Sequence, residues 1–217
     1  MKKRRFACLC LCLGLLLSGC AGDRSAAYSK AIELFADGEY EAAAERFERL
    51  GDYEQAAAYA SYARGLVYYE RGEYAAAAPF FEPVQDFMYG RDRYRYCHGY
   101  QLEEQGAFAE AAALFGELAD EEYEDAAVHE AYCTGRYAEE TKDYETALYG
   151  YEDAHYQDAD GKSVGYADAR ERLENLQFQL YERAFHLRDE GDYGQAITLF
   201  TMLGAYSNSA DQVVVCM

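Results

Sequence analysis

Cysteine and histidine are the residue types in this chain best suited to metal binding or nucleophilic catalysis. Besides Cys20, three cysteines alternate near the N-terminus and three lie far apart: Cys8, Cys10 and Cys12, then Cys97, Cys133 and Cys216. A structural zinc site uses closely spaced cysteine pairs or a matching histidine pair. The distant cysteines lack such spacing and are odd in number, so they predict neither a zinc site nor a dense disulfide framework.

The histidines form no catalytic or metal-binding pattern either. They are His98, His129, His155 and His186, and no two of them lie four residues apart. Gly161-Lys162-Ser163 matches the end of a phosphate-binding loop, but Tyr156 stands where that motif requires its first glycine. The carboxylates are spread over expected helix surfaces, where solvation explains them. We therefore predict a protein that is not an enzyme and that needs no metal and no cofactor.

The chain is strongly acidic. Its 217 residues carry 20 Lys+Arg against 40 Asp+Glu, a net charge of −20 at pH 7. Nucleic-acid binding depends on basic clusters that neutralise phosphates, so no nucleic-acid partner is expected. A basic protein or peptide fits this charge better. With 51% hydrophobic residues and only two prolines, the chain can bury a core and favours an all-α fold.

The first nineteen residues have the organisation of a secretory signal. Met1 to Arg5 is basic, and the uncharged run from Phe6 to Leu17 is too short to span a membrane as a helix. The following Leu17-Ser18-Gly19-Cys20 resembles the lipobox of bacterial lipoproteins. The resemblance implies removal of residues 1–19, lipidation of Cys20 and a short tether over residues 20–25. The expected location is therefore extracytoplasmic, with the membrane reached through the lipid anchor only. An ordinary secretory signal with a chance cysteine is the alternative.

The rest of the chain is organised by a recurring turn motif. A small or polar residue is followed two positions later by an aromatic, and the motif starts at Gly38, Gly72, Gly106, Lys142 and Gly191. A small residue lies five positions after each start, at Ala43, Ala77, Ala111, Ala147 and Ala196. An aromatic follows four positions later, at Phe47, Phe81, Phe115, Tyr151 and Phe200. The first two motifs recur after about 34 residues, the length of a tetratricopeptide repeat.

The repeat resembles the tetratricopeptide repeat. Gly65, Gly99 and Gly135 match its first-helix glycine, and Tyr68 matches its tyrosine. The resemblance implies an all-α fold, a right-handed α-solenoid of about five helix-turn-helix repeats over residues 26–217. In a second pattern, a tyrosine is followed by Asp-Ala or a similar pair. This pair is expected to supply the N-cap at which the first helix of the following repeat begins. The usual proline at this junction is missing.

Two segments depart from the repeat. Residues near 157–167 lengthen the fourth junction and predict a loop insertion before a long helix from about Asp168 to Asp189. Pro79 and Pro83 both fall in the second helix of repeat two. A proline inside a helix removes a backbone donor and clashes with the preceding turn. That helix is therefore expected to bend or to start late.

The repeat also places the three distant cysteines. Each lies 16 to 18 residues after the aromatic of a second helix, so all three occupy one position in the first helices. Neighbouring helices pack about 8–10 Å apart, which is farther than the roughly 7 Å that a disulfide tolerates. We predict that they are small buried residues rather than redox or metal groups.

Tyrosines supply the candidate binding site. One tyrosine recurs at the same position of every first helix, and in tetratricopeptide proteins these helices line a concave groove. The candidate partner-binding residues are Tyr59, Tyr62, Tyr69, Tyr96, Tyr100, Tyr132, Tyr181 and Phe185. Aromatic rings with a polar tip are good anchors for peptides. The alternative is that these tyrosines only pack helices together, as the family's own consensus does.

The resulting prediction is a membrane-anchored extracytoplasmic scaffold that binds a protein or peptide in its concave groove, as an adaptor in envelope assembly or secretion. Arg91, Arg93 and Arg95 form one basic island that either receives an anionic segment or pairs with nearby carboxylates. Two other functions stay open. One is a structural subunit of a stable envelope complex, and the other is a cell-wall glycan binder or glycan-processing enzyme, which requires paired carboxylates in a cleft.

Overall fold

The structure of the chain is a computed structural model, and it describes residues 22–157 and 162–217. The expected signal peptide, Cys20 and residues 158–161 of the expected insertion lie outside the described residues. The chain divides into two compact units, Met1–Gln101 and Leu102–Met217. Within the described ranges, no helix is both long and apolar enough to cross a membrane.

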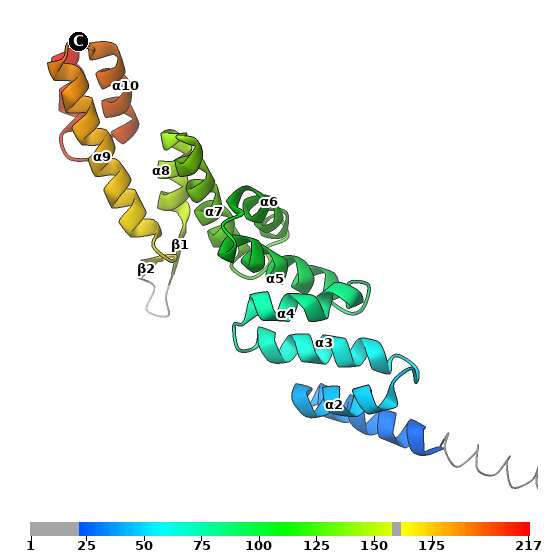
Figure 1. Cartoon of the computed structure of the whole chain (residues 1–217). Coiled ribbons are helices and arrows are strands. Elements are labelled where there is room, and N and C mark those ends of the chain that lie inside the picture. Colours follow the sequence, from blue (N-terminus) through cyan, green and yellow to red (C-terminus); the bar gives the residue numbers. More distant parts are fainter. Residues whose placement is uncertain (1–21, 158–161) are drawn as a thin grey trace, which may run out of the picture. The chain divides into compact units, whose positions relative to one another are not determined.

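The first unit consists of helical hairpins. A helix over residues 22–36 is followed by α2 (Tyr40–Leu50), α3 (Ala56–Tyr69), α4 (Tyr74–Phe81) and a short 3₁₀ helix, η1 (Glu82–Val84). Then α5 (Gly90–Glu104) runs from the first unit into the second. Helices that follow one another lie side by side, as α2, α3 and α4 do (Figure 1).

The second unit continues the hairpins and adds a short strand pair. It contains α6 (Phe108–Ala119), α7 (Ala126–Thr141), α8 (Tyr144–Asp153), β1 (His155–Gln157), β2 (Ser163–Gly165), α9 (Ala169–Asp189), α10 (Tyr193–Leu203) and α11 (Ser209–Cys216). Here too α6, α7 and α8 pack consecutively, and α10 packs on both α9 and α11 (Figure 1). The expected all-α class with five hairpins is present, and α11 begins a further first helix.

The turn between the two helices has the same backbone conformation in all five hairpins. The residue that starts each turn motif has a positive φ, from 64° at Lys142 to 85° at Gly191. The amide after it donates to the carbonyl five residues earlier, as from Glu39 to Leu34 at 2.9 Å. This is the helix-ending pattern in which glycine is favoured because it has no Cβ. Lys142 adopts the same conformation without that advantage.

The repeated small and aromatic residues form the core of each hairpin. The five alanines at the small position are fully buried, and the five aromatic rings are 0–2% exposed. Glycine in the first helix makes room for the ring: a Cβ added to Gly65 would lie 2.6 Å from Cε1 of Phe81. A Cβ added to Gly135 would lie 2.9 Å from Cδ1 of Tyr151. These contacts explain why a small residue and a large ring recur together.

One of the two expectations for the prolines is wrong, because α4 does not start late. It begins at Tyr74, as the turn motif requires, and changes to the 3₁₀ helix η1 after Phe81. Pro79 has no N–H to donate to the carbonyl of Ala75, which therefore needs another donor. Nε2 of Gln101 supplies it at 3.0 Å. A side chain of α5 thus replaces the backbone bond that proline removes.

The ends of the expected segments also differ in detail. Residues 22–25, expected to be tether, are already helical. Arg24 holds this turn in place, because its Nη2 donates to the carbonyl of Leu50 at 2.8 Å and its guanidinium lies over the ring of Tyr53. The insertion carries an antiparallel pair of strands, with Tyr156 opposite Val164. The long helix after it, α9, is present as expected.

The replacement of a backbone bond by Gln101 can be tested with a double-mutant cycle. Gln101→Ala should lower the free energy of unfolding by about 1 kcal/mol, because the carbonyl of Ala75 loses its donor. In a Pro79→Ala background the amide of residue 79 can donate to that carbonyl, so Gln101→Ala should cost clearly less. Chemical denaturation of the four proteins measures both costs, and Gln105→Ala, an exposed neighbour, serves as control. Equal costs in the two backgrounds would contradict this interpretation.

Candidate functional site

The structure separates the tyrosine candidates into buried and half-buried side chains. Three of the first-helix tyrosines are almost fully buried: Tyr62 and Tyr96 are 2% exposed and Tyr132 is 5% exposed. The other candidates are half-buried: Tyr59, Tyr69, Tyr100, Tyr181 and Phe185. The buried rings are packing residues in this structure. Partner binding by the tyrosines stays a prediction.

In the first unit these rings are engaged by neighbouring side chains. Tyr59 stacks on Phe47, with ring centroids 4.8 Å apart, and meets Phe87 edge-on at the same distance. Arg93 lies 4.6 Å above the ring of Tyr69, and its Nε donates to the hydroxyl of Tyr62 at 3.0 Å. Cation–π contacts and hydrogen bonds of this kind hold an arginine in place. Intramolecular pairing therefore accounts for Arg93 of the basic island.

Two first-helix tyrosines in the second unit connect successive repeats. The hydroxyl of Tyr132 donates to Oδ1 of Asp168 at 2.7 Å, and the hydroxyl of Tyr181 donates to Oδ1 of Asn208. Asp168 and Asn208 are the N-cap residues of α9 and α11, but their side chains form no capping bond. The expected capping chemistry is found instead at the second helices, where Asp143 caps α8. The junction residues thus receive tyrosine hydroxyls rather than backbone amides.

Tyr132 belongs to a larger polar network among α7, α8 and α9. Nη1 of Arg136 donates to its hydroxyl at 2.8 Å. Arg172 donates to Oδ2 of Asp168 at 2.9 Å and to Oε2 of Glu139 at 3.0 Å. Burial alone would raise the pKa of Asp168, but the hydrogen bonds from Tyr132 and Arg172 outweigh burial and lower it. Since partly buried charges are stable only when paired, this network is structural.

Removing one hydroxyl from this network should cost stability. Tyr132→Phe leaves Oδ1 of Asp168 without its donor, so the free energy of unfolding should fall by about 1–3 kcal/mol. Tyr137→Phe is the matched control, since Tyr137 lies on the same helix and is 48% exposed. Urea denaturation followed by circular dichroism measures both variants. An unchanged midpoint for Tyr132→Phe would exclude the network as a source of stability.

A buried histidine cluster lies at the start of α7. His129 is fully buried, with Nδ1 2.9 Å from Oε2 of Glu103 and Nε2 3.5 Å from Oδ1 of Asp125. The hydroxyl of Tyr166, just after β2, donates to Oε1 of Glu103 at 2.9 Å. Burial opposes protonation of His129, but the two carboxylates outweigh it and raise the pKa of the imidazole. Sequence analysis did not identify this cluster. Its one local signal is the i,i+4 spacing of Asp125 and His129.

Neither this cluster nor the cysteines form a reactive centre. His129 is enclosed by the rings of Phe115 and Tyr166, with centroids 4.7 and 4.3 Å away. Burial raises the pKa of Cys97 to about 12 and that of Cys133 further still, which disfavours the nucleophilic thiolate. Both thiols are buried and free, and Cys216 is half-buried. The described residues contain no group of three His, Cys, Asp or Glu side chains arranged to hold a metal.

The raised pKa of His129 makes stability depend on pH. The stabilising contribution of the protonated imidazole should be complete below about pH 6.5, the ordinary pKa of histidine. It should be lost as the pH rises through the higher folded-state pKa. The free energy of unfolding of the wild type should therefore decline over this window. In His129→Gln that decline should be smaller; an identical pH profile for the two proteins would contradict the assignment.

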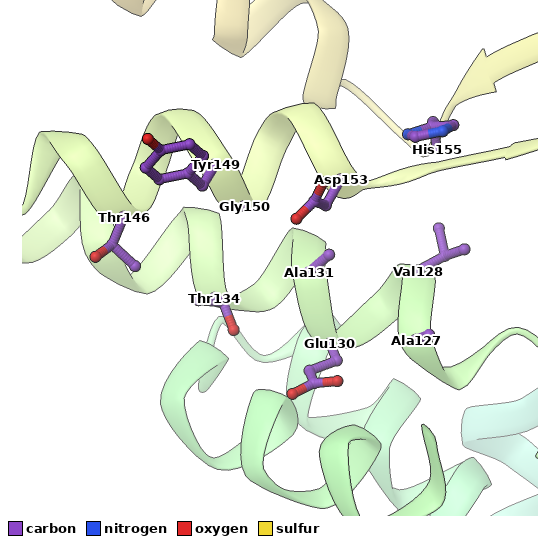
Figure 2. Close-up of a pocket in the computed structure, with 10 residues that line it drawn as sticks. All are labelled: Ala127, Val128, Glu130, Ala131, Thr134, Thr146, Tyr149, Gly150, Asp153 and His155. Carbon is purple, nitrogen blue, oxygen red and sulfur yellow. The ribbon is translucent and has the colours of Figure 1, made fainter. Parts of the chain in front are cut away.

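A groove of about 580 Å³ lies between α7 and α8. Positions on one face of each helix line it: Ala127, Glu130, Ala131 and Thr134 of α7, and Thr146, Tyr149, Gly150 and Asp153 of α8, with Val128 and His155 at one end. Figure 2 shows Tyr149 and Asp153 along α8, Glu130 and Thr134 along α7, and His155 beyond the end of α8. We call this surface the α7–α8 groove.

Small residues at the helix crossing create the groove. A Cβ on Gly150 would lie 2.6 Å from the amide nitrogen of Gly135 and 2.8 Å from the carbonyl oxygen of Ala131. The two backbones therefore approach closely at the floor, while larger side chains form the walls. Tyr149 is 61% exposed. Glu130 and Asp153 are in the lining, which contains no lysine or arginine. The carboxylate of Glu130 points toward α6, where its Oε1 would lie 2.9 Å from a Cβ added to Gly116 (Figure 2). Burial, and to a lesser degree Asp120, raises the pKa of Glu130.

The groove has the features of a binding surface. An apolar floor with hydroxyl and carboxylate groups along its walls suits a cationic side chain whose stem is apolar. The sequence did not predict this groove. The repeated tyrosines lie on first helices, whereas Tyr149 lies on a second helix. No repeated motif marks Tyr149.

Comparisons with known proteins agree with the architecture. Residues 28–85 match the family model of the tetratricopeptide repeat. Neither the curated proteins nor the solved structures give a match to the chain. The matched segment and the helical hairpins show a tetratricopeptide-like α-solenoid fold, which confirms the expected fold class. Tetratricopeptide repeats generally mediate protein–protein interaction, and proteins built from them are typically non-catalytic scaffolds.

Proposed function

We propose that the chain is a membrane-anchored, extracytoplasmic tetratricopeptide-like scaffold that binds a protein or peptide and acts as an adaptor in envelope assembly or secretion. The lipobox-like Leu17-Ser18-Gly19-Cys20 after a basic and apolar segment supports the anchor. The helical repeats support partner binding, because stacked hairpins expose extended surfaces.

The α7–α8 groove is the observation that carries the binding proposal. It is open to solvent, has small apolar residues at its floor, and is flanked by an exposed tyrosine and the carboxylate of Asp153. Exposed tyrosines beside a concave surface are frequent anchors at protein interfaces. The predicted first-helix tyrosines are largely engaged in packing, so the proposal places the main contact surface on this groove.

The charge of the chain supports a basic partner. A net charge of −20 attracts cationic surfaces and speeds their association at low salt. The same charge repels anionic lipid headgroups, so membrane attachment depends on the acyl chains of Cys20. The first helix includes residue 22, and an anchor at Cys20 holds the first hairpin close to the membrane surface.

The anchor is tested by fractionating cells that express the wild type or Cys20→Ser. The wild type should be recovered with membranes and should incorporate a labelled fatty acid, whereas Cys20→Ser should do neither. Cys216→Ser is the matched control, because it removes a half-buried cysteine far from the lipobox. Recovery of Cys20→Ser in the membrane fraction would reject the lipid anchor.

Partner binding is tested separately by crosslinking in intact membranes, followed by purification of the captured protein. The purified partner should bind the full-length chain directly, and its affinity should fall as the salt concentration rises. An enzyme substrate would be released as product, whereas an adaptor keeps its partner unchanged. The absence of any specific partner would reject the scaffold proposal even if the lipid anchor is confirmed.

A further inference from the structure

A second depression lies beside an adjacent face of α8. It has a volume of about 260 Å³ and is formed by α8, α9 and the end of α10. Leu148, Leu173 and Met202 are apolar residues in its lining. Glu145 and Glu152, both exposed on α8, line it as well. We call it the α8–α10 pocket.

Tyr149 belongs to both concave surfaces. The α7–α8 groove uses positions 146, 149, 150 and 153 of α8, and the α8–α10 pocket uses positions 145, 148, 149 and 152. Each set has the i, i+3, i+4, i+7 spacing of one helix face, and the two faces are adjacent. Tyr149 is the residue of α8 common to both sets. At 61% exposure it stands as a ridge between two hollows.

The two hollows differ in chemistry. The α7–α8 groove has an apolar floor of small residues and the carboxylate of Asp153. The α8–α10 pocket has a larger apolar wall, which includes Leu148 and Leu203, 8% and 5% exposed. A lysine or arginine stem with its charge beside a carboxylate fits the groove. An unbranched or γ-branched apolar side chain fits the pocket.

We propose that Tyr149 and the two hollows form a single docking surface for a basic segment of a partner protein. The segment crosses α8 over Tyr149, places a lysine or arginine in the α7–α8 groove and an apolar side chain in the α8–α10 pocket. This inference rests on the proposed scaffold function and names the chemistry of its partner.

Charge complementarity favours a cationic segment at this surface. Three acidic residues of α8 line the two hollows beside Tyr149, namely Glu145, Glu152 and Asp153, and neither lining contains a lysine or arginine. A cationic ε-ammonium or guanidinium group can also contact the exposed face of the Tyr149 ring. A second copy of this chain brings a net charge of −20 to the same surface and is repelled. A cationic segment meets no such repulsion.

The test measures binding of labelled model peptides to the full-length chain in a non-ionic detergent. The probe is a glycine-flanked peptide of alternating lysine and leucine; the comparison peptides replace lysine by glutamate or leucine by serine. The lysine–leucine peptide should bind at least tenfold more tightly than either comparison peptide. Its affinity should fall with added salt, because carboxylates contribute to binding. Equal binding of the glutamate peptide, or no binding of the lysine–leucine peptide, would overturn the inference.

Variants place the binding on this surface. Tyr149→Ala should weaken binding about tenfold or more, as expected of a central aromatic anchor. Asp153→Asn should weaken it several-fold and reduce its salt dependence. The matched controls are Tyr137→Ala and Glu140→Gln, exposed residues of α7 that line neither hollow. Both should leave the affinity unchanged. A Tyr149→Ala protein that is folded by circular dichroism and binds within twofold of wild type would reject the site.

Two further readouts separate this inference from the proposed function. If the partner captured from membranes binds the folded Tyr149→Ala variant as well as the wild type, the scaffold function stands and the docking surface is wrong. If wild type captures no specific partner, the scaffold proposal itself fails. Light scattering tests whether a second copy of the chain occupies the surface instead. A wild-type dimer that Tyr149→Ala converts to a monomer would show that it does.

Discussion

Each hairpin depends on a large aromatic ring of its second helix entering the space that small residues leave open between the two helices. The rings of Phe81 and Tyr151 are 0% and 2% exposed, and each lies against a first-helix glycine, Gly65 or Gly135. Protein interiors tolerate neither voids nor overlaps of this size, so a large ring and a small first-helix residue must occur together. In the first and last hairpins that small residue is an alanine, Ala31 beside Phe47 and Ala184 beside Phe200. The same close approach continues at Gly150, where it forms the floor of the α7–α8 groove. The packing rule that builds the hairpin therefore also shapes the α7–α8 groove.

Polar groups inside the repeats follow from that packing. Closely packed helices bring hydroxyl, imidazole and carboxylate groups out of water, and such groups are stable only when they are paired. Tyr132 reaches Asp168, and His129 lies between Glu103 and Asp125. Among the described residues, no buried side-chain nitrogen or oxygen lacks a hydrogen-bond partner. Both contacts link the first helices of successive repeats, since Tyr132 and His129 lie in α7, Asp168 is the N-cap of α9 and Glu103 lies in α5.

This use of the first helices determines which surface remains for a partner. Tyrosines that recur along the first helices are occupied by ring stacking, by Arg93, or by junction residues. The second helix α8 instead keeps Tyr149 exposed between two hollows with acidic linings. An acidic surface with an aromatic ridge favours cationic segments and disfavours copies of the same acidic chain. The proposed scaffold function and the proposed chemistry of its partner therefore rest on one arrangement.

The sequence alone determined the helical hairpins, because a short-range rule produces them. A glycine turn, an alanine and an aromatic at constant spacing specify where helices end and which faces meet, and the structure has hairpins at all five places. Long-range contacts decided the rest. The helix that contains Pro79 persists because Gln101 donates the hydrogen bond that proline cannot. The side chain of Asp125 contacts His129 instead of capping α7. Whether a tyrosine packs or remains exposed depends on which neighbour covers it. That neighbour comes from another part of the chain, so periodicity could identify Tyr132 as a repeated position but only the tertiary structure could show that it is buried and that Tyr149 is exposed.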